Sequence, residues 1–201
     1  MTLGRVVINI LLIATVPIIV LIRYHSQRGT VQRGVVAGAI SATLVVTGLL
    51  TLRRAPVLSA DAMSVVVVMA EEAVKFGAVY ALLRFRTHPG SRSTSPGATD
   101  NATPASTAPA TAAATGWSVG AGFATAEHLL YATAAPRIVL LRILTAGIIH
   151  TVTARSYSAV LTSRTTPSDG LRVAATLIAG ALLHLGYNLL AQRLDQIPAL
   201  W

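Results

Sequence analysis

Two adjacent carboxylates and a lysine stand in a stretch of sequence that is otherwise apolar enough to cross a membrane. Glu71 and Glu72 are followed by Lys75, the only lysine of the chain, within residues 57–83. A charged side chain at the centre of a membrane-spanning helix costs about 2.5 to 3.5 kcal/mol on insertion scales. Helix geometry places Lys75 one turn beyond the glutamates and beside both of them. One buried ion pair would account for one glutamate, so the second glutamate suggests chemistry.

Three later apolar stretches also carry polar groups. The segment "GFATAEHLLY" places Phe123, Glu127 and Tyr131 at four-residue spacing, which is one face of a helix, with His128 beside Glu127. The polar side chains of the two stretches after it include His150, His184 and Asn188. Polar groups that stood apart would incur the insertion cost on each helix separately. We therefore expect the groups of four successive helices to converge on one polar cavity.

These residues could carry out hydrolysis in which a glutamate and a histidine activate a water molecule. Carboxylates held close together in a low dielectric resist joint ionisation, while Lys75 keeps one of them charged, and this combination makes a candidate general base. Neutral histidines and an asparagine amide can orient the water or donate hydrogen bonds to an oxyanion. The chain has no cysteine and no "HExxH". It therefore lacks a thiol nucleophile and the signature of common zinc hydrolases.

The composition indicates a membrane protein. Of 201 residues, 53% are hydrophobic and 11% are charged, and the mean hydropathy is +0.65, which is far too apolar for an ordinary soluble domain. The net charge of +9 would suggest nucleic acid as a partner of a soluble protein. Most arginines stand between apolar stretches, however, where they anchor helices in a lipid bilayer. We expect an all-α, multi-pass integral membrane protein of the cell membrane that binds no nucleic acid.

Six stretches reach or approach the roughly 20 apolar residues that cross a bilayer as a helix. They are residues 6–22, 35–52, 57–83, 117–135, 138–161 and 171–191. The first is expected to be a retained anchor, because it is long, is followed by Arg23 and has no small-x-small cleavage site nearby. The arginines of the connecting loops divide almost evenly between the two sides, so they leave the orientation open.

The chain divides into three segments that form one membrane domain. Residues 1–86 contain the first three helices, and residues 117–201 contain the last three. Between them, residues 87–116 consist largely of Ala, Thr, Ser, Pro and Gly. This composition cannot bury enough apolar surface to offset its ordering entropy, and we expect a disordered loop.

In chain order, "EEAVKF", "FATAEHLLY", His150 and "HLGYN" resemble the EExxK, FxxxE, H and HxxxN signatures of the PrsW family of intramembrane proteases. That family is similar to the larger group of CAAX prenyl endopeptidases and bacteriocin-processing enzymes, but Lys75 and Glu127 favour the PrsW side. The resemblance covers about residues 57–191 without the loop. The chain departs from the pattern at His128, where the family usually has asparagine, and in the length of the loop.

The resemblance implies a glutamic intramembrane peptidase without a metal or other cofactor. Its substrate would be a single-pass membrane protein, in PrsW proteins typically an anti-sigma factor that is cut to start a stress response. The family pattern implies catalytic roles for Glu71, Glu72, His150, His184 and Asn188. It implies supporting roles for Lys75, Phe123, Glu127 and His128. Which of Glu71 and Glu72 is the base stays open.

Three other functions are compatible with the same residues. Glutamates and histidines of adjacent helices could bind zinc or a di-iron centre in a metal-dependent peptidase. Against this, the Glu-x-x-His spacing of carboxylate bundles is absent and Lys75 would stand beside the cation. Buried ionisable groups also form proton or ion pathways in transporters. Finally, the polar groups could hold the helices of a structural membrane protein together.

Overall fold

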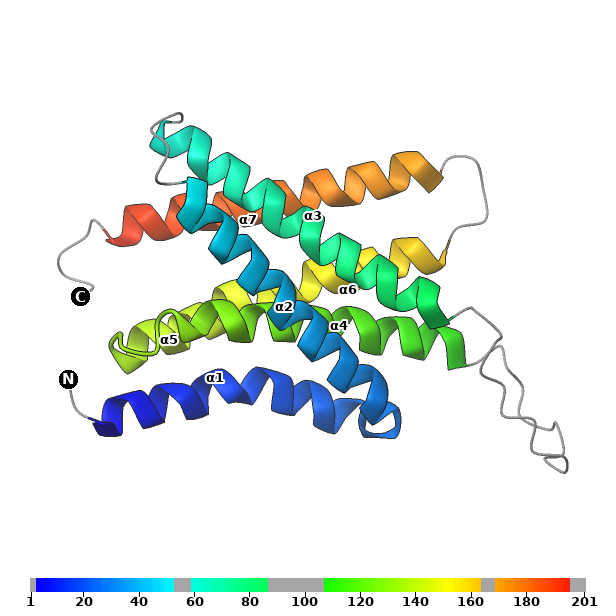
Figure 1. Cartoon of the computed structure of the whole chain (residues 1–201), viewed down its shortest axis with the longest axis horizontal. Coiled ribbons are helices and arrows are strands. Elements are labelled where there is room, and N and C mark those ends of the chain that lie inside the picture. Colours follow the sequence, from blue (N-terminus) through cyan, green and yellow to red (C-terminus); the bar gives the residue numbers. More distant parts are fainter. Residues whose placement is uncertain (1–2, 53–58, 87–106, 164–168, 196–201) are drawn as a thin grey trace, which may run out of the picture.

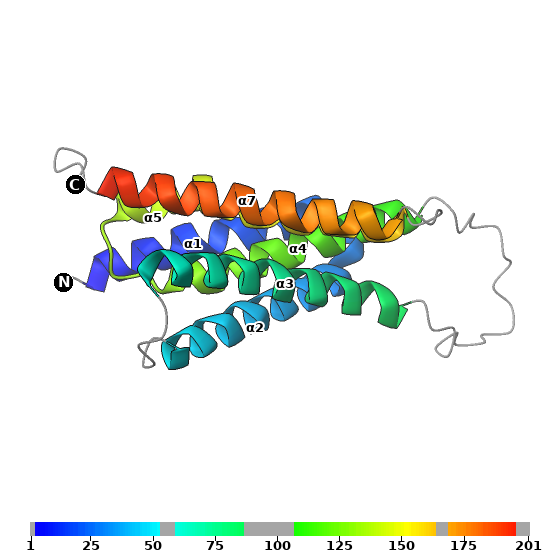
Figure 2. The same ribbon diagram turned by 90° about the horizontal axis from the view of Figure 1, so that it is seen from above.

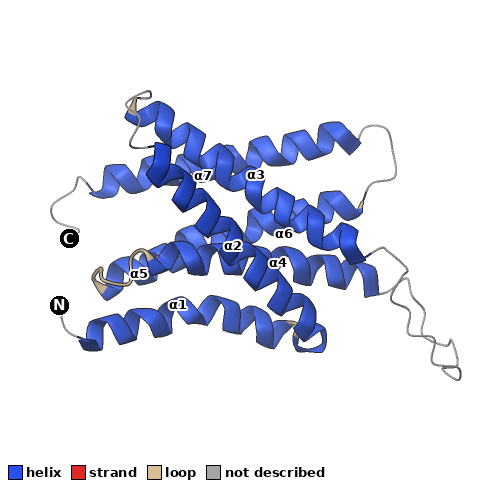
Figure 3. Cartoon of the chain, in the orientation of Figure 1, coloured by secondary structure: helices blue, strands red, loops and turns tan. Residues whose placement is uncertain are grey.

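The computed structural model describes residues 3–52, 59–86, 107–163 and 169–195. Within these ranges every regular element is helical (Figure 3). The elements are α1 (Leu3–Arg23), η1 (His25–Gln27), α2 (Arg28–Leu52), α3 (Ala60–Arg86), α4 (Thr107–Leu129), α5 (Pro136–Arg142), η4 (Ile143–Gly147), α6 (Ile148–Thr162) and α7 (Asp169–Asp195). η1 is a 3₁₀ turn, and η4 is a π-helical turn that joins α5 to α6.

Four helical stretches among the described residues are long and apolar enough to cross a membrane. They are Leu3–Arg23, His25–Gly48, Pro136–Thr162 and Asp169–Ala191. α3 does not meet the same criterion because three charged residues lie near its middle, and α4 does not because it is rich in Ala, Gly and Thr. α1 and α7 expose many leucine and isoleucine side chains, which a bilayer would cover. The prediction of an all-α membrane protein is confirmed.

The centre of the bundle is α4, which packs more extensively against α2 and α6 than any other described pair of elements packs together. Glycines permit this approach. A Cβ at Gly38 of α2 would lie 2.8 Å from the backbone nitrogen of Phe123, and a Cβ at Gly116 of α4 would lie 2.7 Å from the Cα of Arg155. The hydrophobic effect does not drive helices together within lipid, so such close backbone packing is a main source of helix association in membranes.

α3 and α7 complete the helix bundle by packing against α6 and against each other. In Figure 1, α2 and α3 run diagonally across the other helices, and Figure 2 shows α7 on the face opposite α2. α3 contacts α4, α6 and α7, whereas α7 packs mainly on α3 and α6. The three helices that carry Glu71, His150 and His184 therefore meet one another directly.

The predicted boundaries of the fourth span are wrong at both ends. α4 begins at Thr107, so the last ten residues of the expected disordered loop are helical. Alanine has the highest helix propensity of all residues, and Pro109 is tolerated because it falls in the first turn. The rest of that loop, residues 87–106, lies outside the described residues. α4 also ends at Leu129, which leaves Tyr131 in the following turn rather than on the helix face of Glu127.

Candidate active site

Glu71, Glu72 and Lys75 lie on the buried face of α3. Val68 and Val79 are buried on the same face, one turn before and one turn after the polar residues. Spacings of three and four residues along a helix put all five side chains in one stripe. α3 thus packs as an ordinary amphipathic helix whose central buried positions are ionisable.

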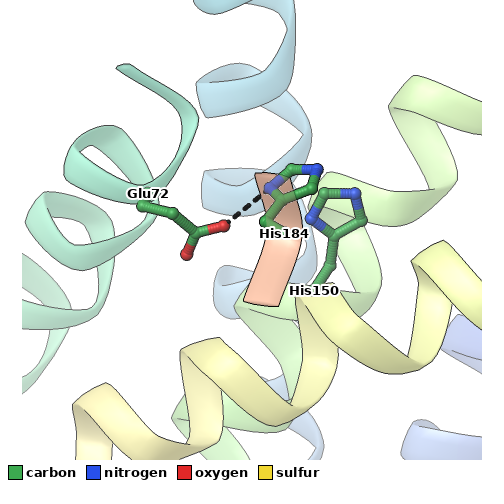
Figure 4. Close-up of side chains that lie close together, drawn as sticks. All are labelled: Glu72, His150 and His184. Atoms are coloured by element: carbon green, nitrogen blue, oxygen red, sulfur yellow. Dashed lines mark hydrogen bonds and ion pairs between the residues drawn. The ribbon is translucent and has the colours of Figure 1, made fainter. Parts of the chain in front are cut away.

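Glu72 lies at the centre of a network of buried polar side chains, which we call the polar network. Its Oε1 lies 2.5 Å from Lys75 Nζ and 2.8 Å from His184 Nδ1. Its Oε2 accepts a hydrogen bond of 2.5 Å from the hydroxyl of Tyr157 on α6. Figure 4 shows the carboxylate of Glu72 reaching from α3 to the ring of His184, with the ring of His150 beside it. Both oxygens of Glu72 are therefore engaged by protein groups.

Lys75 links Glu72 to His150. The side chain of Lys75 is fully buried, and its Nζ lies 2.9 Å from His150 Nδ1 and 3.4 Å from the hydroxyl of Thr153. An ammonium group only donates, so His150 Nδ1 accepts and the ring proton resides on Nε2. Nε2 lies 2.5 Å from Glu127 Oε2, to which it donates. The contacts thus assign a single tautomer to His150.

Arg142 is the second cation of the site. Its Nη2 lies 2.5 Å from Glu127 Oε1, and its guanidinium stacks on the ring of Tyr131 at 3.8 Å. Arg142 is the last residue of α5, directly before the π turn. Glu127 is thereby held between Arg142 and His150.

Glu71 differs from the other two glutamates in having no cation of its own. Its Oε2 is buried and makes no hydrogen bond with any residue that the structure describes. This oxygen faces His184 Nε2 at 3.3 Å. Because Lys75 is paired with Glu72 and Arg142 with Glu127, Glu71 is the carboxylate whose oxygen can still accept hydrogen bonds.

Aromatic rings close one side of the network. The ring of Phe123 packs against that of His150, with centroids 5.0 Å apart, and Lys75 Nζ lies 5.0 Å from the centroid of Phe123. The rings of His150 and His184 meet edge to face at 4.8 Å. The apolar Phe123 keeps water away from the Lys75 ammonium and so strengthens its electrostatic interactions.

Seven of the nine residues singled out in the sequence are brought together, and two are not. His128 is buried, but neither of its ring nitrogens has a hydrogen-bond partner among the described residues. It lies under the π turn, where a Cβ at Gly147 would be 3.3 Å from its Cε1. Asn188 is partly exposed one turn beyond His184, and no hydrogen bond joins it to the described part of the chain.

The sequence did not single out Tyr157, Thr153 or Arg142 as members of the site. Tyr157 follows His150 by seven residues, which is two helical turns and hence the same face of α6. That spacing was the available signal for Tyr157, and Thr153 lies between the two on the same side of the helix. For Arg142 no local signal existed, because its partner Glu127 lies on a different helix.

The helices of this membrane bundle bring carboxylates and imidazoles together at one buried position. Such an arrangement is typical of the active site of an intramembrane hydrolase. The comparison with protein families agrees with this class. Residues 26–200 match the model of the PrsW family, described as "PrsW family intramembrane metalloprotease". The chain belongs to this family. No curated protein and no solved structure matches it.

The family description implies a metal ion, and the site contains residues of the types that bind metals. Glu72, His150 and His184 are buried, and one ligand atom from each lies within 4.8 Å of the others. One glutamate with two histidines is a ligand set of catalytic zinc sites. The outer nitrogens of His150 and His184 face the carboxylates of Glu127 and Glu71, as they do for many metal-bound histidines.

Lys75 sets a condition on metal binding. Its ammonium contacts Glu72 and His150, which are two of the three donors. A divalent cation in the same place would meet a positive charge within hydrogen-bond distance of its ligands, which is unfavourable in a low dielectric. The residues fit a metal once Lys75 has released them. Water activation without a metal, as expected from the sequence, stays a prediction.

Proposed function

We propose that this protein hydrolyses a peptide bond of a membrane-anchored protein and that Glu71 is the general base that activates water. The observation that carries the proposal is the position of Glu71 Oε2. This oxygen is buried, has no hydrogen-bond partner in the described part of the chain and faces His184 Nε2 at 3.3 Å. A buried polar atom gains substantially from a partner such as water.

The hydrogen bonds of His184 suggest how a water molecule is held. A carboxylate only accepts, so the contact with Glu72 assigns the proton of the neutral His184 ring to Nδ1. Nε2 is then an acceptor, and so is the ionised carboxylate of Glu71. A water molecule can donate one hydrogen to each of these two acceptors, which leaves its lone pairs free to attack a carbonyl carbon.

Hydrolysis would then follow the usual course of general base catalysis. Glu71 takes a proton from water while the water oxygen bonds to the peptide carbonyl carbon. The same carboxyl group returns the proton to the nitrogen of the leaving amine when the C–N bond breaks. The Asn188 amide, which lies one turn along α7 from His184 and outside the contacts of the cluster, would donate a hydrogen bond to the carbonyl oxygen as charge develops on it.

Glu72, Lys75 and Glu127 position the groups that touch the reactants. Glu72 orients His184 through Nδ1, and Lys75 holds Glu72 charged and at the same time fixes His150. Such supporting contacts matter because a displacement of about 1 Å can lower a rate by about 100-fold. When a metal is bound, it would be held by Glu72, His150 and His184 and would polarise the carbonyl oxygen as a Lewis acid.

The substrate class and the membrane are further parts of the proposal. The site lies between helices whose outer faces are apolar, which supports a substrate that resides in the bilayer. We propose a single-pass membrane protein as substrate, with an anti-sigma factor as the type that the resemblance implies. We place the protein in the cell membrane as a multi-pass protein.

Comparing protein N-termini in enriched membranes would test this function. Cells expressing the wild type are compared with cells expressing Glu71→Gln at matched levels. The control is Asp169→Asn, which neutralises an acidic residue at the start of α7, away from the site. We expect new termini in or beside a membrane span with the wild type and with Asp169→Asn, and none with Glu71→Gln. A transporter or a structural protein would give identical termini in all three.

A further inference from the structure

Tyr157 is a buried residue that touches the network at a point where no other side chain does. It lies on α6 with no exposed surface, and its ring meets the ring of Phe76 in a T-shaped contact with centroids 5.7 Å apart. Its hydroxyl donates to Glu72 Oε2 at 2.5 Å. Lys75 and His184 both use the other oxygen of Glu72, so Tyr157 is the residue that fixes the second oxygen.

The Tyr157 hydroxyl occupies space that α7 leaves free at Gly180. A Cβ at Gly180 would overlap the hydroxyl oxygen of Tyr157 and would lie 3.5 Å from Glu72 Oε2. Gly180 is buried and lies one turn before His184, on the same face of α7. An alanine there would have to push the hydroxyl away from Glu72 or move α7, which carries His184.

The orientation of the Glu72 carboxyl group depends on this arrangement. The terminal torsion of a glutamate side chain is soft and roughly two-fold, so contacts to one oxygen alone do not hold the carboxylate plane. With Oε2 held by Tyr157, Oε1 stays directed at His184 Nδ1 and Lys75 Nζ. His184 in turn keeps Nε2 directed at Glu71.

We propose that Tyr157 is a positioning residue of the hydrolytic site and that Gly180 is required to make room for its hydroxyl. This inference rests on the proposed peptidase function, because it assigns to Tyr157 the task of orienting Glu72 and, through Glu72, His184. Tyr157 contacts neither the water nor the peptide. Its removal therefore lowers the rate of the chemical step and leaves substrate binding unchanged.

The test is a double-mutant cycle on the purified full-length protein with a cleaved membrane substrate. The variants are Tyr157→Phe, Gly180→Ala and the two together, with Tyr80→Phe and Gly186→Ala as controls. A Cβ at Gly186 meets no atom within 4 Å, and the Tyr80 hydroxyl binds Arg84 instead of the site. We expect each single variant of the cycle to lower kcat by about 10- to 100-fold with KM changed less than about twofold.

The double variant distinguishes positioning from simple packing. With the hydroxyl gone, the nearest ring atom to a Cβ at position 180 would be Cζ at 3.3 Å, which needs a shift of only a few tenths of an ångström. Gly180→Ala should therefore cost less than about threefold in kcat when Tyr157 is already Phe. An unchanged kcat in Tyr157→Phe would overturn the proposal. Equal costs of Gly180→Ala in both backgrounds would overturn it as well.

Thermal unfolding of the same variants separates this inference from the proposed function. If the wild type cleaves no substrate, the peptidase proposal fails, and the unfolding midpoints still show whether Gly180 makes room for the hydroxyl. A smaller effect of Gly180→Ala in the Tyr157→Phe background supports that part of the proposal. Additive effects contradict it. Tyr157→Phe keeps the ring and carries the kinetic test if Gly180→Ala does not accumulate.

Discussion

At the scale of single residues, the two glutamates of α3 differ in their partners and should differ in what their loss does. Glu72→Gln leaves the buried Lys75 without its counter-charge and weakens the contacts of His184 and Tyr157. Removing one partner of a buried ion pair typically lowers the free energy of unfolding by about 3 to 5 kcal/mol. Glu71→Gln removes a carboxylate that has no cation and should change stability by less than about 1 kcal/mol.

The expected pattern is a separation of activity from stability. Glu71→Gln should lower cleavage by about 100-fold or more, which is the contribution of a general base, while its unfolding midpoint stays close to that of the wild type. Glu72→Gln should lower both. Cleavage of a membrane reporter and thermal unfolding in detergent measure the two quantities. A fully active Glu71→Gln variant would exclude Glu71 as the base.

The relation between Lys75 and a metal ion gives a second prediction at this scale. Since the Lys75 ammonium contacts two of the three donors, it should compete with a divalent cation for them. Lys75→Met should bind zinc about tenfold more tightly than the wild type, a difference of about 1.4 kcal/mol. A competition titration with a chromophoric chelator measures this affinity.

A variant that keeps the charge is the control for this titration. Lys75→Arg should bind zinc no better than the wild type, because the guanidinium is always positive. Adding His184→Ala to Lys75→Met should remove the gain, because it removes one of the donors. Equal affinities of Lys75→Met and the wild type would show that the lysine does not compete with the metal.

The sequence predicts which helix faces meet, but it does not predict the pairing of individual groups. Spacing along one helix places Glu71, Glu72 and Lys75 together, and the repeated polar positions of the later helices favour a common cavity. The assignment of Lys75 to Glu72 and of Arg142 to Glu127 depends on contacts between helices. Sequence spacing carries no information about those, and for the same reason it leaves open which of the two adjacent glutamates pairs with Lys75.

At the scale of elements, the position of α6 against α4 depends on Gly120. A Cβ at this position would lie 2.5 Å from the carbonyl oxygen of His150 and 2.5 Å from the Cα of Thr151. Both are backbone atoms, so a rotamer change cannot relieve the overlap. Gly120→Ala must therefore shift α6, which carries His150 and Tyr157 into the site.

We expect Gly120→Ala to lower the free energy of unfolding by about 1 to 3 kcal/mol, the usual cost of overpacking, and to lower kcat as well. Gly77→Ala is the matched control, because a Cβ at Gly77 on α3 meets no atom within 4 Å. The control should retain activity and gain slightly in helix stability. Full activity of Gly120→Ala would mean that α6 is free to move without disturbing the site.

The start of α4 shows where prediction from composition fails at this scale. A stretch of Ala, Thr and Pro reads as a linker when only its composition is considered, since it has no apolar periodicity. The alanines of residues 107–116 nevertheless have high helix propensity, and Ala112 and Ala114 are buried. Small side chains allow α4 to be enclosed by other helices on nearly every side, which removes the amphipathic pattern that would have marked it.

At the scale of the whole molecule, the helix ends define two sides of the bundle. The first turn of α1 and the last turn of α7 lie at one end (Figures 1 and 2), together with the end of α2 and the start of α3. The end of α3, the start of α4 and the start of α7 lie at the other end. If every long helix crosses the bilayer, including α3 and α4, these two ends face opposite compartments.

Because the chain contains no cysteine, single cysteines can map this topology with a membrane-impermeant maleimide. Gly4, Gly29 and Gly170 are suitable sites, since a Cβ at each meets no atom within 4 Å; Ser95, outside the described residues, marks the segment between α3 and α4. We expect Gly29→Cys, Gly170→Cys and Ser95→Cys to react from one side and Gly4→Cys from the other. Labelling of Ser95→Cys from the side of Gly4→Cys would show that α3 does not cross. The glutamates would then reach the site from a re-entrant helix, and the proposed depth of catalysis would have to be revised.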